Sequence, residues 1–376
     1  MVLHHGASVA VRHIKAAAEV GIRYNPDYNG ASQEGIAMSQ ATIAGGRRMS
    51  TAHCYLDPIR KRRNLHIETE ALTERLLLDG RRCTGVRYSV ADDVREACAS
   101  SEVVVSAGTI NSPQLLELSG IGQPERLGTL GIEVRHALPG VGENLRDHYV
   151  PRTRWLIGKK GITFNDRGRG LRLAHQAMRY ALSRQGMLAM AGAPIRAFVC
   201  SRAGLEAPDL MLGWIPMLTE PSPRGPRISR QSGVILYAHP MRPESKGHIH
   251  ITAADPRRPP AINFNFLSSP PDAELTVRAV RIAREIMTAP AMAHFQVSEV
   301  APRRRSWHRW RNPGLGEESG GNHLPPGGDL QDGVRPDGGR RCPASRLWRS
   351  GPEGRRCFDH ADADIGQYQC AINHDW

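Results

Sequence analysis

Several kinds of segment are missing from this 376-residue chain, and each absence narrows what the protein can be. No apolar run reaches the length of a transmembrane helix. The start, MVLHHGASVAVRHIK, lacks the apolar core of a secretory signal peptide. The seven cysteines are scattered, without a CxxC pair or a spacing typical of metal ligands. We therefore expect free thiols in a reducing, cytoplasmic compartment and no metal site.

Aromatic residues are scarce, at 5% of the chain, whereas positive charge is abundant. The net charge of +13 would suit a nucleic acid, an anionic lipid or an acidic substrate. The arginines are spread widely, however, and no aromatic residues interleave with them as they do where proteins stack on bases. We predict no nucleic-acid partner, while a basic protein that binds polyanions stays open as an alternative.

The chain is long enough for two domains with a sizeable core, and 40% of its residues are apolar. Apolar residues at helical spacing predict a helix over residues 8–20. Two strand-like runs flank Asp79 and Gly80, and an Asp-Gly pair between such runs is a signal for a β-hairpin.

Residues 106–122, SAGTINSPQLLELSGIG, have the pattern of a nucleotide-binding corner. The β-branched run at residues 102–105 predicts a buried strand just before it. Ala107 and Gly108 are small enough for a backbone or a flat ligand to approach closely.

A helix is expected to follow this small-residue turn. Asn111 and Ser112 can cap the helix, Pro113 suits its first position, and Gly120 can end it. Many α/β proteins contain such corners without a ligand, so the pattern alone leaves a purely structural role open.

The literal residues are more specific. GTINSPQLLELSGIG resembles the second signature of the glucose–methanol–choline (GMC) family of FAD-dependent alcohol oxidoreductases. Residues 46–56 fit a family pattern, GxRxSxAxxYL, and residues 138–148, LPGVGENLRDH, are nearly verbatim for the family. The resemblance covers residues 20–302 and is nearest to the choline-dehydrogenase-like branch.

This resemblance implies FAD as the cofactor. By family position the cofactor-binding residues are Thr73, whose backbone amide would contact the adenine, together with Ser106, Ala107 and Gly108. The family also has a GxGxxG turn that grips the FAD pyrophosphate, and this sequence contains none. We therefore expect the chain to begin inside the family's fold and to bind FAD weakly or not at all.

The expected fold class is α/β, with a partial Rossmann-like FAD-binding domain over residues 1–150. Residues 151–302 would form an α+β substrate domain, an antiparallel sheet with helices on one face. Within this region the sequence predicts strands at residues 195–200, 210–215, 233–238 and 248–252, and helices at residues 171–185 and 272–287. His248 and His250 are expected to be solvated strand histidines rather than metal ligands.

The composition changes after Pro302. Residues 303–376 contain only eight Leu, Ile, Val, Met or Phe, too few to offset the entropy of ordering, so we expect a disordered tail. One interpretation is an Arg/Gly-rich tail that binds RNA or another polyanion.

A frameshift is the interpretation we favour for this tail. Codons exist for residues 324–333 and 366–376 that, read one base later, give YHPVGTCKMG and GNTNAPSIMIG. Both strings resemble the catalytic motifs of the GMC family, and both need the same shift. Pro325 and Gln369 then stand where the family has its catalytic histidine and asparagine, so we predict no catalytic residue in this chain.

The implied function is an FAD-dependent alcohol dehydrogenase that moves a hydride from a primary alcohol, such as choline, to flavin. We expect this chain itself to be inactive. A non-catalytic partner of an intact paralogue is a second alternative. The alcohol, the electron acceptor and the oligomeric state stay open.

Overall fold

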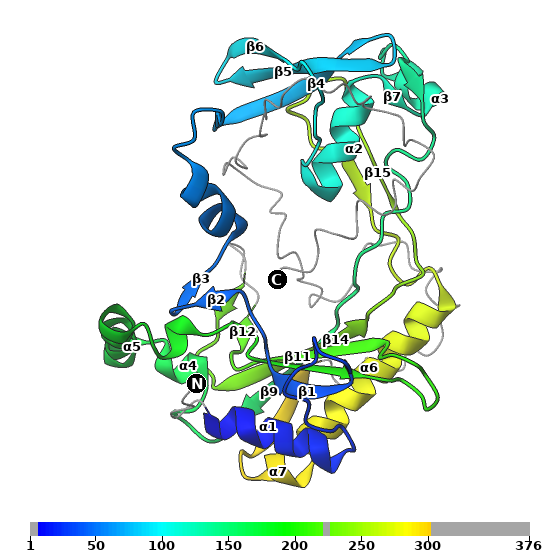
Figure 1. Cartoon of the computed structure of the whole chain (residues 1–376). Helices are drawn as coiled ribbons and strands as arrows, with labels where there is room; N and C mark the ends of the chain where they lie inside the picture. The colour runs from blue at the N-terminus through cyan, green and yellow to red at the C-terminus, as the bar shows by residue number, and fades with distance from the viewer. Residues whose placement is uncertain (1–6, 221–225, 302–376) are drawn as a thin grey trace. The chain divides into compact units, whose positions relative to one another are not determined.

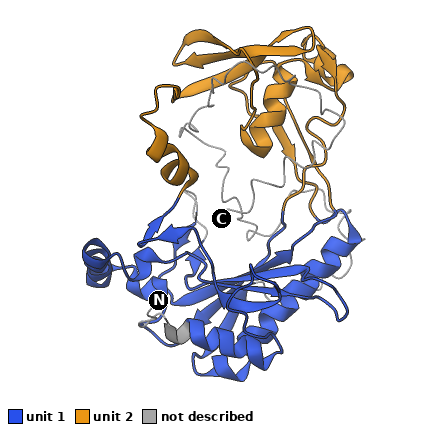
Figure 2. Ribbon diagram, in the orientation of Figure 1, with its two compact units in different colours: residues 1–49, 148–244, 267–333 blue, residues 50–147, 245–266, 334–376 orange. Residues whose placement is uncertain are grey.

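The computed structural model describes residues 7–220 and 226–301 (Figure 1). The chain forms two compact units, each assembled from separate pieces of sequence (Figure 2). Unit 1 contains residues 7–49, 148–244 and 267–301, and unit 2 contains residues 50–147 and 245–266. The predicted contiguous division into residues 1–150 and 151–302 differs from these units. The first helix packs on helices from the end of the described chain, which places residues 7–49 in unit 1.

Unit 1 is built on a six-stranded antiparallel sheet with the order β1-β10-β11-β14-β9-β17. Its strands are β1 (Gly35–Met38), β9 (Arg152–Ile157), β10 (Ile195–Val199), β11 (Leu210–Ile215), β14 (Gly233–Pro240) and β17 (Val297–Ala301). The strands predicted at residues 195–200, 210–215 and 233–238 are therefore confirmed.

Three helices cover one face of this sheet: α1 (Ala7–Glu19), α6 (Pro270–Thr288) and α7 (Pro290–Ala293) (Figure 1). Alternate strand residues such as Trp155, Leu212 and Trp214 join the core beneath these helices, as the period of two in a strand requires. The helices predicted at residues 8–20 and 272–287 are confirmed.

The smaller elements of unit 1 are β2 (Ile43–Ala44), β3 (Arg47–Arg48), α4 (Phe164–Arg167), α5 (Gly170–Ser183), η3 (Met187–Ala189), β12 (Thr219–Glu220) and β13 (Arg227–Ile228). Helix α5 is the amphipathic helix predicted at residues 171–185, but none of its residues is buried. Leu171 and Leu182 are 90% and 80% exposed. The segment therefore forms the predicted amphipathic helix, but none of its apolar side chains is buried against another part of the described chain.

Unit 2 contains a three-stranded antiparallel sheet of β4 (Ala71–Asp79), β5 (Arg82–Val90) and β6 (Asp93–Cys98). The hairpin predicted at Asp79 and Gly80 is confirmed. The remaining elements of unit 2 are η1 (Ala52–Leu56), η2 (Asp57–Ile59), α2 (Gly108–Leu118), β7 (Ile121–Gly122), α3 (Pro124–Thr129), β8 (His136–Ala137), β15 (His248–His250) and β16 (Ala261–Asn263). A small core joins α2 to the sheet through Leu76, Cys83, Val86, Leu115, Ile121 and Val141.

The buried strand predicted at residues 102–105 is wrong. This segment belongs to no strand of the described chain, although Val103 and Val105 pack against the unit 2 core and Val104 is 62% exposed. The alternation is that of an extended chain, but a strand also needs a hydrogen-bonded neighbour, and no ladder in the described chain includes these residues.

The predicted start of α2 also needs correction. The helix begins at Gly108, before Asn111 and Ser112, and Pro113 lies inside it. Gly108 has a φ of +85°, a conformation that glycine adopts readily, and this lets the chain turn directly into the helix. Ser112 accepts a hydrogen bond from the Ala107 N–H at 3.2 Å, so it supports the turn from within. Gly120, with a φ of +82°, ends the helix as predicted.

Candidate functional site

The four predicted cofactor-binding residues all lie in unit 2, on two elements that pack together. Ser106, Ala107 and Gly108 form the turn before α2, and Ser106 and Ala107 are exposed. A Cβ built on Gly108 would meet no atom within 4 Å, so the turn has open space on that side. Thr73 lies on β4, half-buried, beside a bulge at Thr73/Arg75.

Ser119 connects β4 to the end of α2. Its hydroxyl accepts the Leu76 N–H at 2.8 Å and donates to the Leu115 carbonyl at 2.6 Å. All three residues are buried, so neither hydrogen bond competes with water. The strand that carries Thr73 is thereby held against the helix that follows Gly108.

A buried polar cluster lies near this same C-terminal end of α2. Glu117 is fully buried, and its Oε1 lies 2.7 Å from Nδ1 of His250. Its Oε2 accepts the Ile251 N–H at 2.8 Å. The second ring nitrogen of His250, Nε2, lies 3.0 Å from Oε1 of Glu143. The imidazole therefore lies between two carboxylates, with one ring nitrogen within hydrogen-bond distance of each.

The expectation of a solvated histidine at position 250 is wrong, because His250 is only 2% exposed. The alternating pattern of β15 predicted a side chain on one face of a strand, but its partners come from distant sequence. No group of three His, Cys, Asp or Glu in the described chain is arranged to hold a metal ion.

Gly142 and Glu143 both contact β15 and hold residues 138–148 close to it. Gly142 has a φ of +79°, and a Cβ there would overlap the Ile249 carbonyl and lie 2.8 Å from Nδ1 of His250. Burial by itself would raise the pKa of Glu143, but hydrogen bonds from Gln123 and His250 outweigh it and lower the pKa below its ordinary value. The cluster thus fastens three segments to one another: α2, residues 138–148 and β15.

Unit 1 carries a different polar region, on the sheet face opposite α1, α6 and α7. Thr153 and Trp155 point to the helices, so Arg152 and Arg154 of β9 point the other way. Arg196 on β10 does the same, because its neighbours Ile195 and Ala197 belong to the core. We call this surface, defined by Arg152, Arg154 and Arg196, the arginine face. Sequence reasoning missed it, although each arginine alternates with residues of the core.

Comparison with known proteins identifies the family to which this chain is similar. Residues 3–150 and 243–319 match the N- and C-terminal parts of the GMC oxidoreductase family. The chain belongs to the GMC oxidoreductase family. The second match extends past residue 302, beyond the predicted break in composition.

Curated relatives agree with this membership. The chain is 35% identical over 289 residues to an oxygen-dependent choline dehydrogenase of Photobacterium profundum, which covers 77% of this chain and 50% of the relative. It is 34% identical over 287 residues to the protein of that name from Staphylococcus xylosus, covering 76% of this chain and 50% of the relative. The chain thus spans about half the length of the curated relatives it matches.

Solved structures share the fold. The formate oxidase of Aspergillus oryzae superposes with a TM-score of 0.72 at 22% identity, over 82% of this chain and 59% of that protein. Pyridoxine 4-oxidase from Mesorbium loti gives a TM-score of 0.67 at 22% identity, over 80% and 55%. No helix in residues 7–220 and 226–301 has the length and apolar character needed to cross a bilayer.

FAD is the cofactor of the GMC family. The residues present fit one edge of such a nucleotide, since the exposed turn at Ala107 and Gly108 leaves room for close approach. The GxGxxG turn that would bind the pyrophosphate does not occur in the sequence. Pro325 and Gln369, the positions predicted to replace the catalytic histidine and asparagine, lie outside the described residues.

Proposed function

We propose that this chain carries the substrate unit and part of the flavin-binding unit of an FAD-dependent alcohol oxidoreductase. On its own it binds FAD weakly and does not oxidise an alcohol. Thr73, Ser106, Ala107 and Gly108 would contact the nucleotide, and bound FAD would supply the hydride acceptor. Choline remains the example that the resemblance suggests.

The turn at Gly108 carries this proposal. It is open and held in place from two sides, because Ser112 supports it and Ser119 fastens α2 to β4. Membership of the GMC family and the sequence of residues 106–122 support a nucleotide contact there. Without a glycine-rich phosphate turn in the sequence, the contact is left without the strong anion grip of a helix N-terminus.

The purified chain tests this directly through its flavin absorbance. We expect much less than one FAD per chain, and no bleaching of the flavin band when a primary alcohol is added. Stoichiometric flavin that bleaches with alcohol would overturn the proposed weak binding and inactivity.

Residual affinity can be located by titrating FAD and following quenching of its fluorescence. Gly108→Val should weaken binding at least about tenfold, because a β-branched residue is strained at a φ of +85° and would fill the open side of the turn. The matched control is Gly128→Ala on α3, where a Cβ meets nothing and φ is not positive. Equal affinity of the Gly108 variant, the control and the unaltered chain would remove the turn from the site.

A further inference from the structure

Helix α5 turns its apolar side to solvent, which is the reverse of the usual arrangement in a globular protein. Leu171, Met178 and Leu182 are 90%, 61% and 80% exposed. At about 3.6 residues per turn, these three side chains and the exposed Ala174 and Ala181 fall within about 100° of one another around the helix. We call these five residues the apolar stripe. The helix lies apart from α1, α6 and α7, and none of its residues is buried (Figure 1).

The polar side of α5 is the one that packs against unit 1. Oε1 of Gln176 accepts the Met187 N–H at 3.2 Å. A methyl group built on Gly186 would lie 2.9 Å from this oxygen and 3.4 Å from Cδ of Arg179. Gln176 and Arg179 are half-buried, whereas every member of the apolar stripe is exposed. Polar contacts therefore fix the orientation of the helix, and no part of the described chain buries the stripe.

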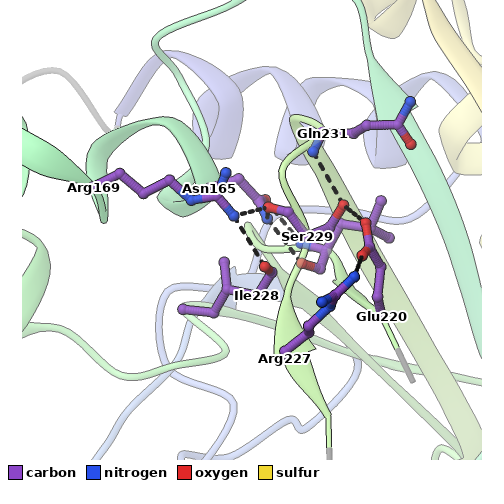
Figure 3. A network of polar contacts seen from close by, with 8 residues as sticks. Asn165, Arg169, Glu220, Arg227, Ile228, Ser229 and Gln231 are labelled. Carbon is purple, nitrogen blue, oxygen red and sulfur yellow. Dashed lines mark hydrogen bonds and ion pairs between the residues drawn. The ribbon is translucent and has the colours of Figure 1, made fainter. Parts of the chain in front are cut away.

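Both ends of α5 are fastened to other parts of unit 1. Arg169, directly before the helix, donates to the carbonyls of Ile228 and Ser229 at 2.9 and 2.6 Å (Figure 3). Ser229 is fully buried, so this anchor reaches the interior of the unit. At the other end of the helix, a Cβ built on Gly46 would overlap the carbonyl oxygen of Arg184. The apolar stripe is thus presented by a helix that is held at both ends.

The charge around the apolar stripe has one sign. Residues 167–205 contain seven arginines and neither Asp nor Glu. Arg172 and Arg179 each follow an apolar member of the stripe, so both lie along the same flank of it. The described part of the chain supplies no ion-pair partner to either arginine. Asp166, just before this segment, is engaged by the hydroxyl of Ser232, which donates to it at 2.7 Å.

We propose that α5 binds the surface of an anionic lipid bilayer, with the apolar stripe inserted among the acyl chains and the arginines at the headgroups. A helix that joins a large apolar side to basic flanks lies in the plane of such an interface. Arginine side chains are long enough to reach lipid phosphates while their methylene groups stay on apolar surface. A second copy of this chain is a poorer occupant, because two such helices would bring like charges together. This inference concerns docking and goes beyond the proposed function.

Co-sedimentation of the full chain with lipid vesicles tests the proposal. One preparation is pure phosphatidylcholine, and the other is an equal mixture of phosphatidylcholine and phosphatidylglycerol. We expect at least about tenfold tighter binding to the mixture, and this binding should weaken as salt is added because salt screens the headgroup charge. No detectable binding to the anionic vesicles, or equal binding to both preparations, would overturn the proposal. The assay requires neither flavin nor alcohol, so its result is independent of the proposed function.

Variants that leave the net charge unchanged separate α5 from the general attraction of a basic protein. Leu171→Gln and Leu182→Gln should each weaken binding to the anionic vesicles about tenfold, because each withdraws a leucine side chain from the acyl chains. Val11→Gln is the matched control, because Val11 is 50% exposed on α1, and its binding should equal that of the unaltered chain. Circular dichroism should be the same for all three, since no residue of α5 is buried. An equal loss in the control, or unchanged binding of both α5 variants, would remove the stripe from the contact.

The basic flank is tested in the same assay. Arg172→Gln should weaken binding to the anionic vesicles about fivefold, and Arg172→Lys should retain it, because the attraction depends on charge. Arg278→Gln on α6 is the matched control, since it removes an exposed arginine from another helix. An equal loss in this control would show that only net charge matters and would contradict a contact through α5.

Sedimentation velocity without lipid examines a second copy of the chain as the occupant. We expect the unaltered chain and the Leu182→Gln variant to have the same oligomeric state. A dimer that Leu182→Gln converts into a monomer would assign the apolar stripe to chain–chain contact and would overturn the lipid proposal.

Discussion

Different kinds of interaction stabilise the interior of each of the two units. Unit 1 has an extensive apolar core that links its sheet to α1, α6 and α7, and it includes fully buried Trp214 and Phe295. Unit 2 has a much smaller apolar core and relies on buried polar groups, Glu117, Ser119 and His250. Unit 1 contains the buried histidines His13 and His239, whose pKa values burial lowers to about 3 and about 4, whereas unit 2 contains the Glu143–His250 contact, which lowers the pKa of Glu143. The comparison therefore predicts two units that respond differently to substitution and to acid.

The largest effect is expected in the core of unit 1. Trp214→Ala should lower the free energy of unfolding of unit 1 by about 3–5 kcal/mol, because it removes a large side chain that is 2% exposed and leaves a cavity. Chemical denaturation monitored by circular dichroism measures the loss. Leu171→Ala is the control, since Leu171 is 90% exposed and its loss should be close to zero. A loss below about 1 kcal/mol for the Trp214 variant would mean that the core is not tightly packed.

An intermediate effect is expected from the polar cluster of unit 2. Glu117→Gln keeps the shape but loses the charge-assisted contact with His250 while the Ile251 N–H still needs an acceptor. It should lower the free energy of unfolding of unit 2 by about 1.5–3 kcal/mol. Hydrogen exchange of the Ile251 amide reports the loss locally. Glu143→Gln is the matched substitution at a side chain that is 37% exposed, and it should cost less than about 1 kcal/mol. Equal losses in the two variants would contradict the assigned difference in burial.

The smallest effect is a pH dependence of unit 2. The pKa of Glu143 is lowered in the folded chain, so its contribution to stability is fully present above its ordinary value of 4.5. That contribution is lost as the pH falls through the lowered folded pKa, because the unfolded chain then binds more protons. Denaturation from pH 6 to about pH 3 should show the Glu143→Gln variant approaching the unaltered chain. A gap between the two that stays constant over this range would contradict the lowered pKa.

The regular elements of unit 1 were predictable because their cause is local. Residues 210–215 and 233–238 alternate between core and opposite face, and a period of two is visible in the sequence itself. The hairpin at Asp79 and Gly80 has an equally local signal in its turn residues.

The features that escaped prediction depend on partners far away in sequence. His250 is buried because Glu117 and Glu143 lie 133 and 107 residues away from it. Residues 102–105 have the composition of a strand, but pairing is decided by neighbours that periodicity does not reveal. The start of α2 was placed too late because capping residues were weighed above the positive φ that Gly108 provides. The arginine face became visible only when the strand register was known.

The ring of Tyr237 limits which residues fit at position 213. The ring occupies the volume that any side chain in place of Gly213 would need, so a larger residue there requires the Tyr237 ring to move or to be replaced. A smaller residue at 237 would free that volume for a side chain at 213 on the neighbouring strand. Substitutions on this face of the sheet therefore start from the pair and not from either residue alone.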